Sequence, residues 1–321
     1  MNSIQEIADQ IIDRDNFILL GHAIPDGDCV GSLLGLFMGL KSLGKNAEMF
    51  LQDKVPPIYN YLSCVEQIKN NWESPDTGSN IIYLDCSDEE RVGDKIQKLL
   101  QGDYCRLNID HHRTNDFFGN YNYVDPQAAA TAEIVFELLI QMKVEISPDI
   151  AAALYAGIIM DTGSFMNSNT TSHTMRVAGA LLEKGADTDT ARINLFESKS
   201  RKEIFLIRQA LQSVSITEDG RIAWMVLPYD DINAIGAADL HPEGIINYAR
   251  MINGVEVAVL FRETKPGTIK IGFRSKNYVD VASLAEKIGG GGHRQAAGAS
   301  LEGRMDEVIH IVIDMVRDVM V

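Results

Sequence analysis

The sequence predicts an α/β protein: an N-terminal parallel sheet with helices on both faces, a helical linker and a smaller C-terminal α+β domain. Three observations predict this class. The chain has 321 residues, more than a single core usually holds. Short apolar runs alternate with helical patterns in its first part, and this pattern changes to paired strands near residue 190. We therefore place the first domain at residues 1–187, the linker at 188–213 and the second domain at 214–321.

Strands of the first domain are predicted where apolar runs are short and continuous. Such runs occupy residues 16–21, 81–85 and 106–110, and they are typical of strands buried on both faces of a parallel sheet. Helical spacing of apolar residues predicts helices over 30–43, 128–143 and 148–160. Gly44 is a stop signal for the first helix, while Ser147 and Pro148 are typical of the start of the third.

The second part of the chain shows a different arrangement. A helical connector rich in charged residues is predicted over 188–212. Residues 214–217 and 221–227, which flank Glu218-Asp219-Gly220, predict a hairpin. Strands at 255–262 and 268–274, a helix near 281–287 and a terminal helix from Met305 complete a small α+β domain.

Composition excludes several classes of protein. Apolar residues make up 45% of the chain, but no uninterrupted apolar run is long enough to span a membrane. The N-terminus alternates acidic and apolar residues and does not resemble a secretion signal. Cys29, Cys64, Cys86 and Cys105 lie far apart, which disfavours both a disulfide framework and a zinc finger. We expect a cytoplasmic protein without a membrane partner.

The charge of the chain limits its partners. The formal net charge is −16 at pH 7. Proteins that hold long nucleic acid draw their affinity from lysines and arginines that neutralise phosphates. We therefore expect no binding of long duplex nucleic acid, although metal ions could still hold a small anionic substrate. Much of the acidity is also explained by solubility alone.

Histidines and aspartates fall at the ends of the predicted strands. His22, Asp26 and Asp28 follow the first strand, Asp85 ends the second, Asp110, His111 and His112 end the third, and Asp161 ends the helix through residues 155–160. In a parallel sheet, residues after neighbouring strands converge on one crevice, so these groups can meet. They provide enough ligands for two divalent cations, with one carboxylate shared.

Each of these residues has a simpler explanation when taken alone. Asp and Gly favour turns, an Asp after a strand is commonly a helix cap, and the adjacent pair of histidines fits an ordinary loop. Their joint placement favours metal binding. Carboxylates brought close together repel one another unless a proton or a cation is present. A pair of cations removes this repulsion and activates water against a phosphoryl group.

The same residues resemble the DHH phosphoesterase superfamily. The family pattern is H-x-x-x-D-x-D after the first strand, an isolated Asp after the next, then Asp-His-His and a later Asp followed by Thr-Gly. The sequence is similar to the NrnA-type branch in three further stretches, at residues 110–139, 157–171 and 272–300. The resemblance covers essentially the whole chain. Ile24 departs from it, because the family often has Asn at that position, and Cys29 follows the last Asp of the first motif.

The resemblance implies a role for each matching residue. His22 and Asp26 would bind one manganese ion, Asp28, His111 and Asp161 a second, and Asp85 would bridge the two. His112 would face the scissile phosphate, and Asp110 would orient the histidines. The cofactors implied are therefore two divalent cations, with Mn²⁺ as the usual ion of the family.

Four glycines near the C-terminus form a second candidate site. Residues 289–292 precede His293 and could be a flexible joint or a backbone-lined surface that binds an anion. The resemblance is to the C-terminal domain associated with DHH enzymes, which holds the substrate. It implies substrate binding by Gly290, Gly291, Gly292, His293, Arg274 and Ser275, with Arg262 as a further candidate. Arginines on strands are also commonly just solubilising.

The resemblance implies a metal-dependent 3′–5′ exonuclease acting on short oligoribonucleotides, with phosphatase activity on 3′-phosphoadenosine 5′-phosphate. An alternative is a phosphodiesterase for cyclic di-AMP or linear di-adenylate. An inorganic pyrophosphatase would carry a different C-terminal signature in place of the glycine segment, and a RecJ-like DNA exonuclease would be longer, with an added strand-binding module. A non-catalytic nucleotide sensor would be expected to lack at least one ligand, and none of the six is missing. The sequence leaves a homodimer open.

Overall fold

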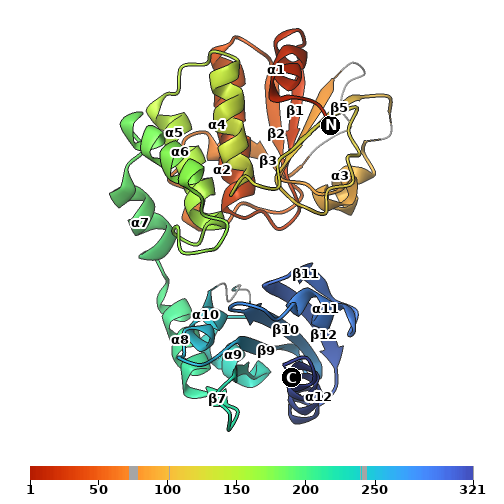
Figure 1. Ribbon diagram of the computed structural model, residues 1–321, viewed down its shortest axis with the longest axis vertical. Coiled ribbons are helices and arrows are strands. Elements are labelled where there is room, and N and C mark those ends of the chain that lie inside the picture. Colours follow the sequence, from red (N-terminus) through yellow and green to blue (C-terminus); the bar gives the residue numbers. More distant parts are fainter. Residues whose placement is uncertain (72–78, 101, 239, 241–243, 321) are drawn as a thin grey trace. The chain divides into compact units, whose positions relative to one another are not determined.

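A computed structural model describes residues 1–71, 79–100, 102–238, 240 and 244–320. The chain forms two compact units, Met1–Ser198 and Lys199–Val321, which are described separately (Figure 1). The division falls between helices α7 (Thr188–Phe196) and α8 (Arg201–Gln212). It therefore lies within the predicted linker 188–213, whose limits stay a prediction.

The first unit is built on a parallel sheet. Its described strands are β1 (Phe17–Leu20), β2 (Ala47–Phe50), β3 (Ile68–Lys69), β4 (Asn80–Leu84), β5 (Cys105–Asp110) and β6 (Tyr121–Val124). Within the described residues they form a six-stranded sheet in the order β3-β2-β1-β4-β5-β6. All neighbours are parallel. Strands β1, β4 and β5, which carry the predicted site residues at their ends, therefore lie next to one another.

The apolar runs explain why these strands are central. In β1, Phe17 and Leu19 enter the core on one face of the sheet, whereas Ile18 and Leu20 enter the core on the other face. Strand β4 divides in the same way, with Ile82 on the first face and Tyr83 on the second. A strand that is covered on both sides has no polar face, which is why its sequence is continuously apolar.

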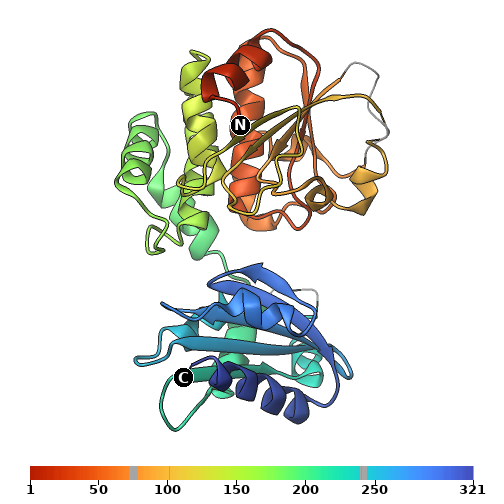
Figure 2. The ribbon, with the colours of Figure 1, turned by 45° about the vertical axis from the view of Figure 1, so that its right-hand side comes forward.

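Helices cover both faces, as predicted, but unequally. The larger core is covered by α1 (Ile4–Ile12), α2 (Gly27–Ser42), α4 (Thr131–Gln141), α5 (Pro148–Asp161) and α6 (Ser172–Glu183). Helices α2, α4 and α5 pack against one another on this face (Figure 2). Among the described residues, the opposite face is covered by the short 3-10 helix η3 (Glu89–Val92) and helix α3 (Asp94–Gln97), and its core is smaller. Two further 3-10 helices, η1 (Pro57–Tyr59) and η2 (Val65–Gln67), lie between β2 and β3.

Glycines allow α2 and α5 to approach closely. A Cβ atom on Gly31 of α2 would lie 2.4 Å from the carbonyl oxygen of Ala153 in α5. A Cβ atom on Gly157 would lie 2.7 Å from Cβ of Ala132 in α4 and 3.1 Å from Oδ1 of Asp28. Only a hydrogen atom fits at either position. This close contact brings the end of α5, and with it Asp161, beside the start of α2.

Three strands of the first sheet were not predicted. Strands β2 and β6 are short and carry polar residues among apolar ones, and β3 has only two residues. Strands β3 and β6 form the edges of the described sheet. Edge strands are covered less completely, so they lack the continuous apolar run by which the central strands were identified.

The second unit is a mixed sheet covered on both faces. Its described strands are β7 (Ser215–Ile216), β8 (Ile222–Leu227), β9 (Val257–Lys265), β10 (Thr268–Ser275), β11 (Gly291–His293) and β12 (Ala296–Glu302). Within the described residues the order is β11-β12-β10-β9-β8-β7, and β8–β9 is the parallel pair. The predicted hairpin is confirmed as the antiparallel pair β7–β8.

Two cores hold this second sheet. Helices α11 (Val281–Glu286) and α12 (Met305–Asp318) cover one face, and both helices were predicted. Helices α8, α9 (Tyr229–Ile235) and α10 (Ile245–Arg250) cover the other face. Helices α9 and α10 were not predicted, because each is too short to show a clear helical period. The described part of the chain contains no helix long and apolar enough to cross a membrane.

Candidate metal centre

The loop after β1 combines helix capping with site geometry. Asp26 is the N-cap of α2, and its Oδ1 accepts the backbone N–H groups of Asp28 (3.0 Å) and Cys29 (3.1 Å). His22 donates Nδ1–H to the carbonyl oxygen of Ala23 at 2.8 Å. Its Nε2 therefore faces the carboxylates, 3.6 Å from Asp26 Oδ1 and 3.4 Å from Asp85 Oδ2. Asp26 thus serves as a helix cap and also lies within the histidine–carboxylate cluster.

Asp85 lies at the centre of the cluster. It follows β4, is 2% exposed and has a φ of +60°, a left-handed conformation that aspartate tolerates better than most residues. Its Oδ2 faces His22, and its Oδ1 lies 3.6 Å from His111 Nε2 and 3.6 Å from His112 Nδ1. The hydroxyl of Thr131 donates to the same Oδ1 at 3.1 Å. Asp85 therefore contacts residues on both sides of the site.

His111 connects Asp85 with the remaining carboxylates. Its Nδ1–H points to the carbonyl oxygen of Ala128 at 3.3 Å. Its Nε2 lies 3.8 Å from Asp28 Oδ2 and 3.9 Å from Asp161 Oδ2. Histidines that bind metals commonly donate their other ring N–H to a carbonyl or carboxylate, which orients the ring. His22 and His111 both have this arrangement.

His112 is held differently from the other two histidines. Its Nδ1 lies 2.7 Å from Oδ1 of Asp110, which is fully buried at the end of β5. Oδ2 of the same carboxylate accepts a hydrogen bond from Nδ2 of Asn115 at 2.7 Å. Burial alone would raise the pKa of Asp110, but the hydrogen bonds from His112 and Asn115 and the positive histidines outweigh it and lower that pKa.

All eight site residues predicted in the first unit therefore lie in one cluster. Two groups could each hold a metal ion: His22, Asp26 and Asp85, and Asp85, His111 and His112. Asp85 belongs to both groups. Asp28 and Asp161 each lie within 4 Å of Nε2 of His111, and Asp110 contacts Nδ1 of His112.

Sequence reasoning missed four polar residues that hydrogen-bond side chains of this cluster: Ser32, Asn115, Thr131 and Asn169. Ser32 donates its hydroxyl to Oδ1 of Asp28 at 3.2 Å, and Nδ2 of Asn169 lies 3.2 Å from Oδ2 of Asp161. Asn115 and Thr131 lie in the stretch 110–139 and Asn169 in the stretch 157–171, both of which resemble the NrnA-type branch, and this resemblance was the available signal. Apart from that of Ser32, their partners are distant in sequence or across a turn, so spacing alone could not reveal these contacts.

The electrostatics of the site suit divalent cations. Burial and the charge of Asp85 raise the pKa of Asp28 well above its usual range. Burial also raises the pKa of Asp161 to about 6. Burial alone would lower the pKa of His22, but Asp26 and Asp85 outweigh it and raise that pKa to about 11. Imidazole nitrogens and carboxylate oxygens are common ligands of divalent metals, and cations at this place would replace the protons that the cluster otherwise retains.

The predicted substrate residues all lie in the second unit. Arg262 on β9 is 8% exposed, and its Nη2 donates to the carbonyl oxygen of Ala238 at 2.8 Å. Its Nε and the Oγ of the fully buried Ser275 have no hydrogen-bond partner among the described residues. Arg274 on β10 is half-buried, and its Nη1 donates to the carbonyl oxygen of Phe273.

The glycine segment is more ordered than a flexible joint. Gly291 and Gly292 start strand β11, which pairs with β12. A Cβ atom on Gly290 would lie 2.2 Å from the carbonyl oxygen of Gly298, and Gly292 has a φ of +144°. Both positions require glycine for steric reasons. The backbone of His293 ends β11, and its side chain lies outside the described residues. Substrate binding by all these residues stays a prediction.

Comparison with known proteins identifies the family. Residues 16–158 match the DHH family, N-terminal domain, and residues 237–318 match the DHHA1 domain. A bifunctional oligoribonuclease and PAP phosphatase NrnA from Thermus thermophilus is 34% identical over 92% of this chain and 88% of its own length. The chain belongs to the DHH phosphoesterase family, in its NrnA-type branch.

Other relatives agree with this assignment. The protein of the same name from Bacillus subtilis is 30% identical over 94% of both chains. A crystal structure of an exopolyphosphatase-related protein from Bacteroides fragilis matches with a TM-score of 0.92 at 24% identity, covering 98% of this chain and 96% of that one. This last likeness shows the fold alone. The predicted family and fold class are therefore confirmed.

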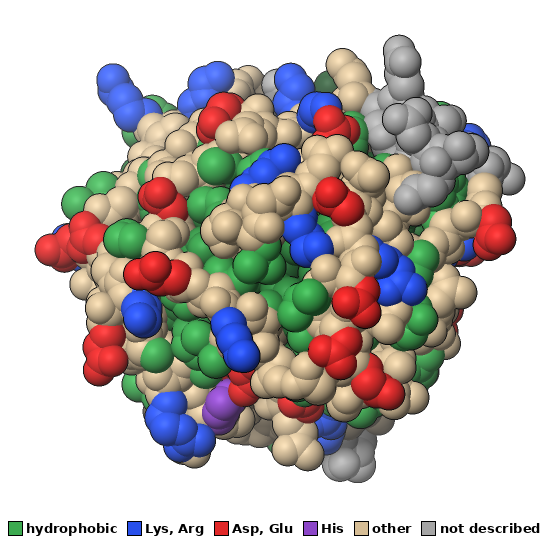
Figure 3. Space-filling view, turned by 90° about the horizontal axis from the view of Figure 1, so that it is seen from above, with side chains coloured by type: hydrophobic (Ala, Val, Ile, Leu, Met, Phe, Trp, Pro, Cys, Tyr) green, Lys and Arg blue, Asp and Glu red, His purple; other side chains and the backbone are tan. Residues whose placement is uncertain are grey.

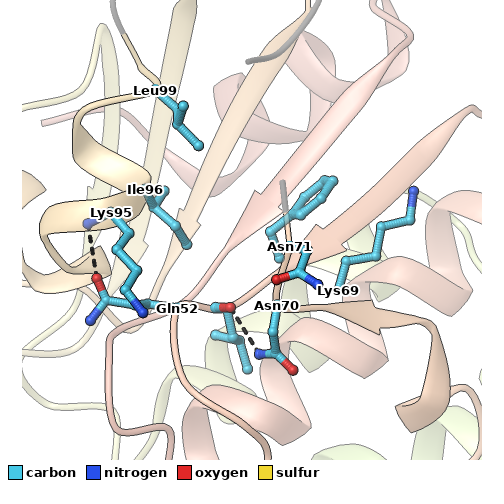
Figure 4. A pocket seen from close by; sticks show the side chains of 9 residues that line it. Gln52, Lys69, Asn70, Asn71, Lys95, Ile96 and Leu99 are labelled. Carbon is cyan, nitrogen blue, oxygen red and sulfur yellow. Dashed lines mark hydrogen bonds between the residues drawn. The ribbon is translucent and has the colours of Figure 1, made fainter. Parts of the chain in front are cut away.

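A cavity elsewhere in the first unit is separate from this cluster. It measures about 230 Å³ and lies beyond the ends of β2 and β3, beside α3 (Figure 4). Its lining is Phe50, Leu51, Gln52, Lys69, Asn70, Asn71, Lys95, Ile96 and Leu99. Gln52 Oε1 accepts the backbone N–H of Lys95 at 3.0 Å, and Asn70 Nδ2 donates to the carbonyl oxygen of Leu51 at 2.9 Å. No predicted site residue belongs to this lining.

The face of the molecule drawn in Figure 3 carries charged side chains of both signs. On that face, lysine and arginine side chains are interspersed with aspartates and glutamates.

Proposed function

We propose that this chain is a metal-dependent hydrolase that degrades short oligoribonucleotides in the 3′–5′ direction and dephosphorylates 3′-phosphoadenosine 5′-phosphate. One observation carries the proposal: imidazoles and carboxylates from three adjacent strand ends and one helix end converge around Asp85. The names of the relatives from Thermus thermophilus and Bacillus subtilis support this substrate class.

In this proposal the site would hold two divalent cations, and manganese is the ion that the family resemblance implies. His22 and Asp26 would hold one, Asp28, His111 and Asp161 the other, and Asp85 both. Such ions supply Lewis acidity and neutralise charge at a phosphoryl group. The orientation of His22 and His111 through their Nδ1–H groups leaves each Nε2 directed toward the carboxylates, which supports this assignment.

His112 and Asp110 would act on the substrate in this proposal. Because Asp110 accepts the Nδ1 proton of His112, the imidazole has a defined tautomer and orientation. Its Nε2 is then the atom that would meet a phosphate oxygen, either to stabilise its charge or to transfer a proton. The predicted substrate-binding residues of the second unit are Arg274, Ser275, Arg262, His293 and the glycines Gly290, Gly291 and Gly292.

A parallel assay tests the proposal. The manganese-loaded protein is incubated with linear di-adenylate, cyclic di-AMP, 3′-phosphoadenosine 5′-phosphate and pyrophosphate, and an Asp85→Asn variant controls for contaminating enzymes. We expect linear di-adenylate and 3′-phosphoadenosine 5′-phosphate to be hydrolysed fastest, and only by the wild type. Faster hydrolysis of cyclic di-AMP would select the alternative phosphodiesterase. Binding of nucleotides without any hydrolysis would select the sensor.

End-labelled tetra-adenylate resolves the direction of cleavage. A 5′-labelled substrate should yield a ladder of shortened labelled products if the enzyme removes nucleotides from the 3′ end. Immediate release of labelled mononucleotide would contradict the 3′–5′ direction. The cytoplasmic location, a homodimer and the exclusion of long duplex partners stay predictions from the sequence.

A further inference from the structure

Thr131 contacts two carboxylates of the candidate metal centre at once. Its backbone N–H donates to Asp28 Oδ2 at 2.6 Å, and its hydroxyl donates to Asp85 Oδ1 at 3.1 Å. The next residue, Ala132, donates its N–H to Asp28 Oδ1 at 2.8 Å. Asp28 and Asp85 follow different strands, and Thr131 is fully buried between them.

The start of α4 explains why the backbone N–H groups point at Asp28. The N-cap of this helix is Ala130, which offers no side-chain acceptor to the first turn. The first N–H groups of a helix have no partner within the helix, so they need an external acceptor. Here the carboxylate of Asp28 accepts two of them, and the positive end of the helix dipole favours this negative charge. Asp28 thus caps a helix that starts 103 residues later in the chain.

The hydroxyl of Thr131 makes a further hydrogen bond, to Asp85, that is not required to cap α4. The helix start is already satisfied by Asp28 through backbone groups, so a valine at position 131 would preserve that cap. What valine would lose is the hydrogen bond to Oδ1 of Asp85. The same Oδ1 is the atom that faces His111 and His112. The hydroxyl therefore determines which way the central carboxylate is turned.

We propose that Thr131 is a positioning residue that sets the spacing and orientation of Asp28 and Asp85 for metal binding. Its backbone N–H binds the carboxylate of Asp28 and its hydroxyl binds that of Asp85, so the start of α4 fixes the positions of both carboxylates. This inference rests on the proposed metal centre. Groups that orient metal-binding carboxylates commonly change metal affinity by about 10- to 100-fold when they are removed.

Three variants test this role in the full chain. Thr131→Val removes the hydroxyl and keeps the shape, Thr131→Ser keeps the hydroxyl, and Thr217→Val removes a buried threonine hydroxyl from the second unit. The affinity and number of bound Mn²⁺ ions are measured by titration calorimetry, and the unfolding temperature is measured without metal. We expect Thr131→Val to bind Mn²⁺ about 10-fold more weakly or worse. Thr131→Ser and Thr217→Val should bind like the wild type.

The outcomes separate this inference from the proposed function. If the wild type binds Mn²⁺ and Thr131→Val binds it equally well, the positioning role is wrong and the metal centre stands. If Thr131→Ser is as weak as Thr131→Val, the hydroxyl is not the cause and the role is also wrong. If the wild type itself binds no Mn²⁺, the metal centre and the inference both fail. Should Thr131→Val not fold, Thr131→Ala against Thr131→Ser makes the same comparison.

Discussion

Asn115 donates a hydrogen bond from Nδ2 to Oδ2 of Asp110 at 2.7 Å, on the carboxylate oxygen that does not contact His112. The same Nδ2 also donates to Oδ1 of Asn108 on β5 at 2.8 Å. Asn108 in turn donates from its own Nδ2 to the carbonyl oxygen of Cys86 at 3.0 Å. All of these side chains are buried. A network of this kind is rigid only while every member has its partner.

Replacing Asn115 should therefore reduce activity without removing any predicted ligand. In Asn115→Ala, Oδ2 of Asp110 loses its donor, and a buried acceptor without a partner costs about 1–3 kcal/mol of unfolding free energy. The carboxylate becomes free to turn, so His112 loses its orientation. We expect kcat on linear di-adenylate to fall about 10- to 100-fold with little change in KM. An exposed asparagine of α9, Asn233, provides the control variant Asn233→Ala, which should retain full activity. A rise in KM alone would contradict this explanation.

Ile24 has a conformation that is unfavourable for its side chain. It is 66% exposed and has a φ of +57°, although β-branched residues rarely adopt left-handed backbone angles. Its N–H donates to Asp53 Oδ2 at 3.1 Å. Ile24→Asn keeps that N–H and tolerates the angle, so we expect it to raise the unfolding free energy by roughly 1 kcal/mol. Urea denaturation measures the change. Ile24→Val keeps a β-branched side chain at this backbone angle, so its unfolding free energy should not rise. An equal rise in Ile24→Val would mean that the gain comes from a smaller exposed apolar side chain and not from relief of backbone strain.

Two glycine-to-alanine variants should change stability in opposite directions. In Gly31→Ala, the new Cβ atom would meet backbone atoms of α5 at 2.4 Å, so α2 and α5 must move apart. We expect a loss of about 1–3 kcal/mol in unfolding free energy. In Gly179→Ala, within α6, the new atom meets nothing within 4 Å. There we expect a gain of about 0.5–1 kcal/mol, because alanine favours a helix. Thermal unfolding of both variants checks the prediction, which fails if the two effects share a sign.

The metal-free protein should become less stable as pH rises above neutrality. The pKa of His22 is raised from 6.5 to about 11 in the folded chain, and that of His111 is raised to about 9. The folded state therefore binds more protons than the unfolded state in this range. A raised histidine pKa contributes stability that is complete below pH 6.5 and is lost as pH rises through the folded value.

Denaturation in a chelator at several pH values measures this effect. We expect the midpoint in urea to fall between pH 6.5 and pH 9, a window set by the pKa of His111. Added Mn²⁺ should reverse the trend, because cations compete with protons for the same nitrogens and bind better at higher pH. His22→Gln should flatten the pH dependence of the metal-free protein. A metal-free stability that rises over this window would be incompatible with the prediction.

Arg262 is a buried cation whose side chain donates, among the described residues, one hydrogen bond, to the carbonyl oxygen of Ala238. Burial lowers the pKa of its guanidinium, because removal from water disfavours the charged form. If the site binds a substrate phosphate, Arg262→Met should raise KM for 3′-phosphoadenosine 5′-phosphate and leave kcat similar. The variant should also unfold at a higher temperature, because an incompletely compensated charge is removed. If the variant is more stable and its KM is unchanged, Arg262 does not bind the substrate phosphate.

The sequence by itself determined the strands that carry the site. Residues 17–20, 80–84 and 105–110 are recognisable because a strand buried on both faces admits few polar side chains before it ends. His22, Asp85 and His111 follow directly, and the carboxyl ends of parallel neighbours necessarily lie at one edge. The family pattern added the proposed roles of Asp110 and His112, which local periodicity alone does not distinguish from ordinary loop residues.

Only the tertiary structure decided how these groups are held. Three contacts depend on helices and turns that meet only in the folded chain. Asp28 caps α4, Thr131 donates a hydrogen bond to Asp85, and Asn115 donates one to Asp110. The edge strands β3 and β6 and the pairing of the glycines in β11 were likewise decided by neighbours. The physical reason is range: local patterns record which face of a segment is buried, whereas hydrogen bonds between distant segments depend on atomic positions that no single segment contains.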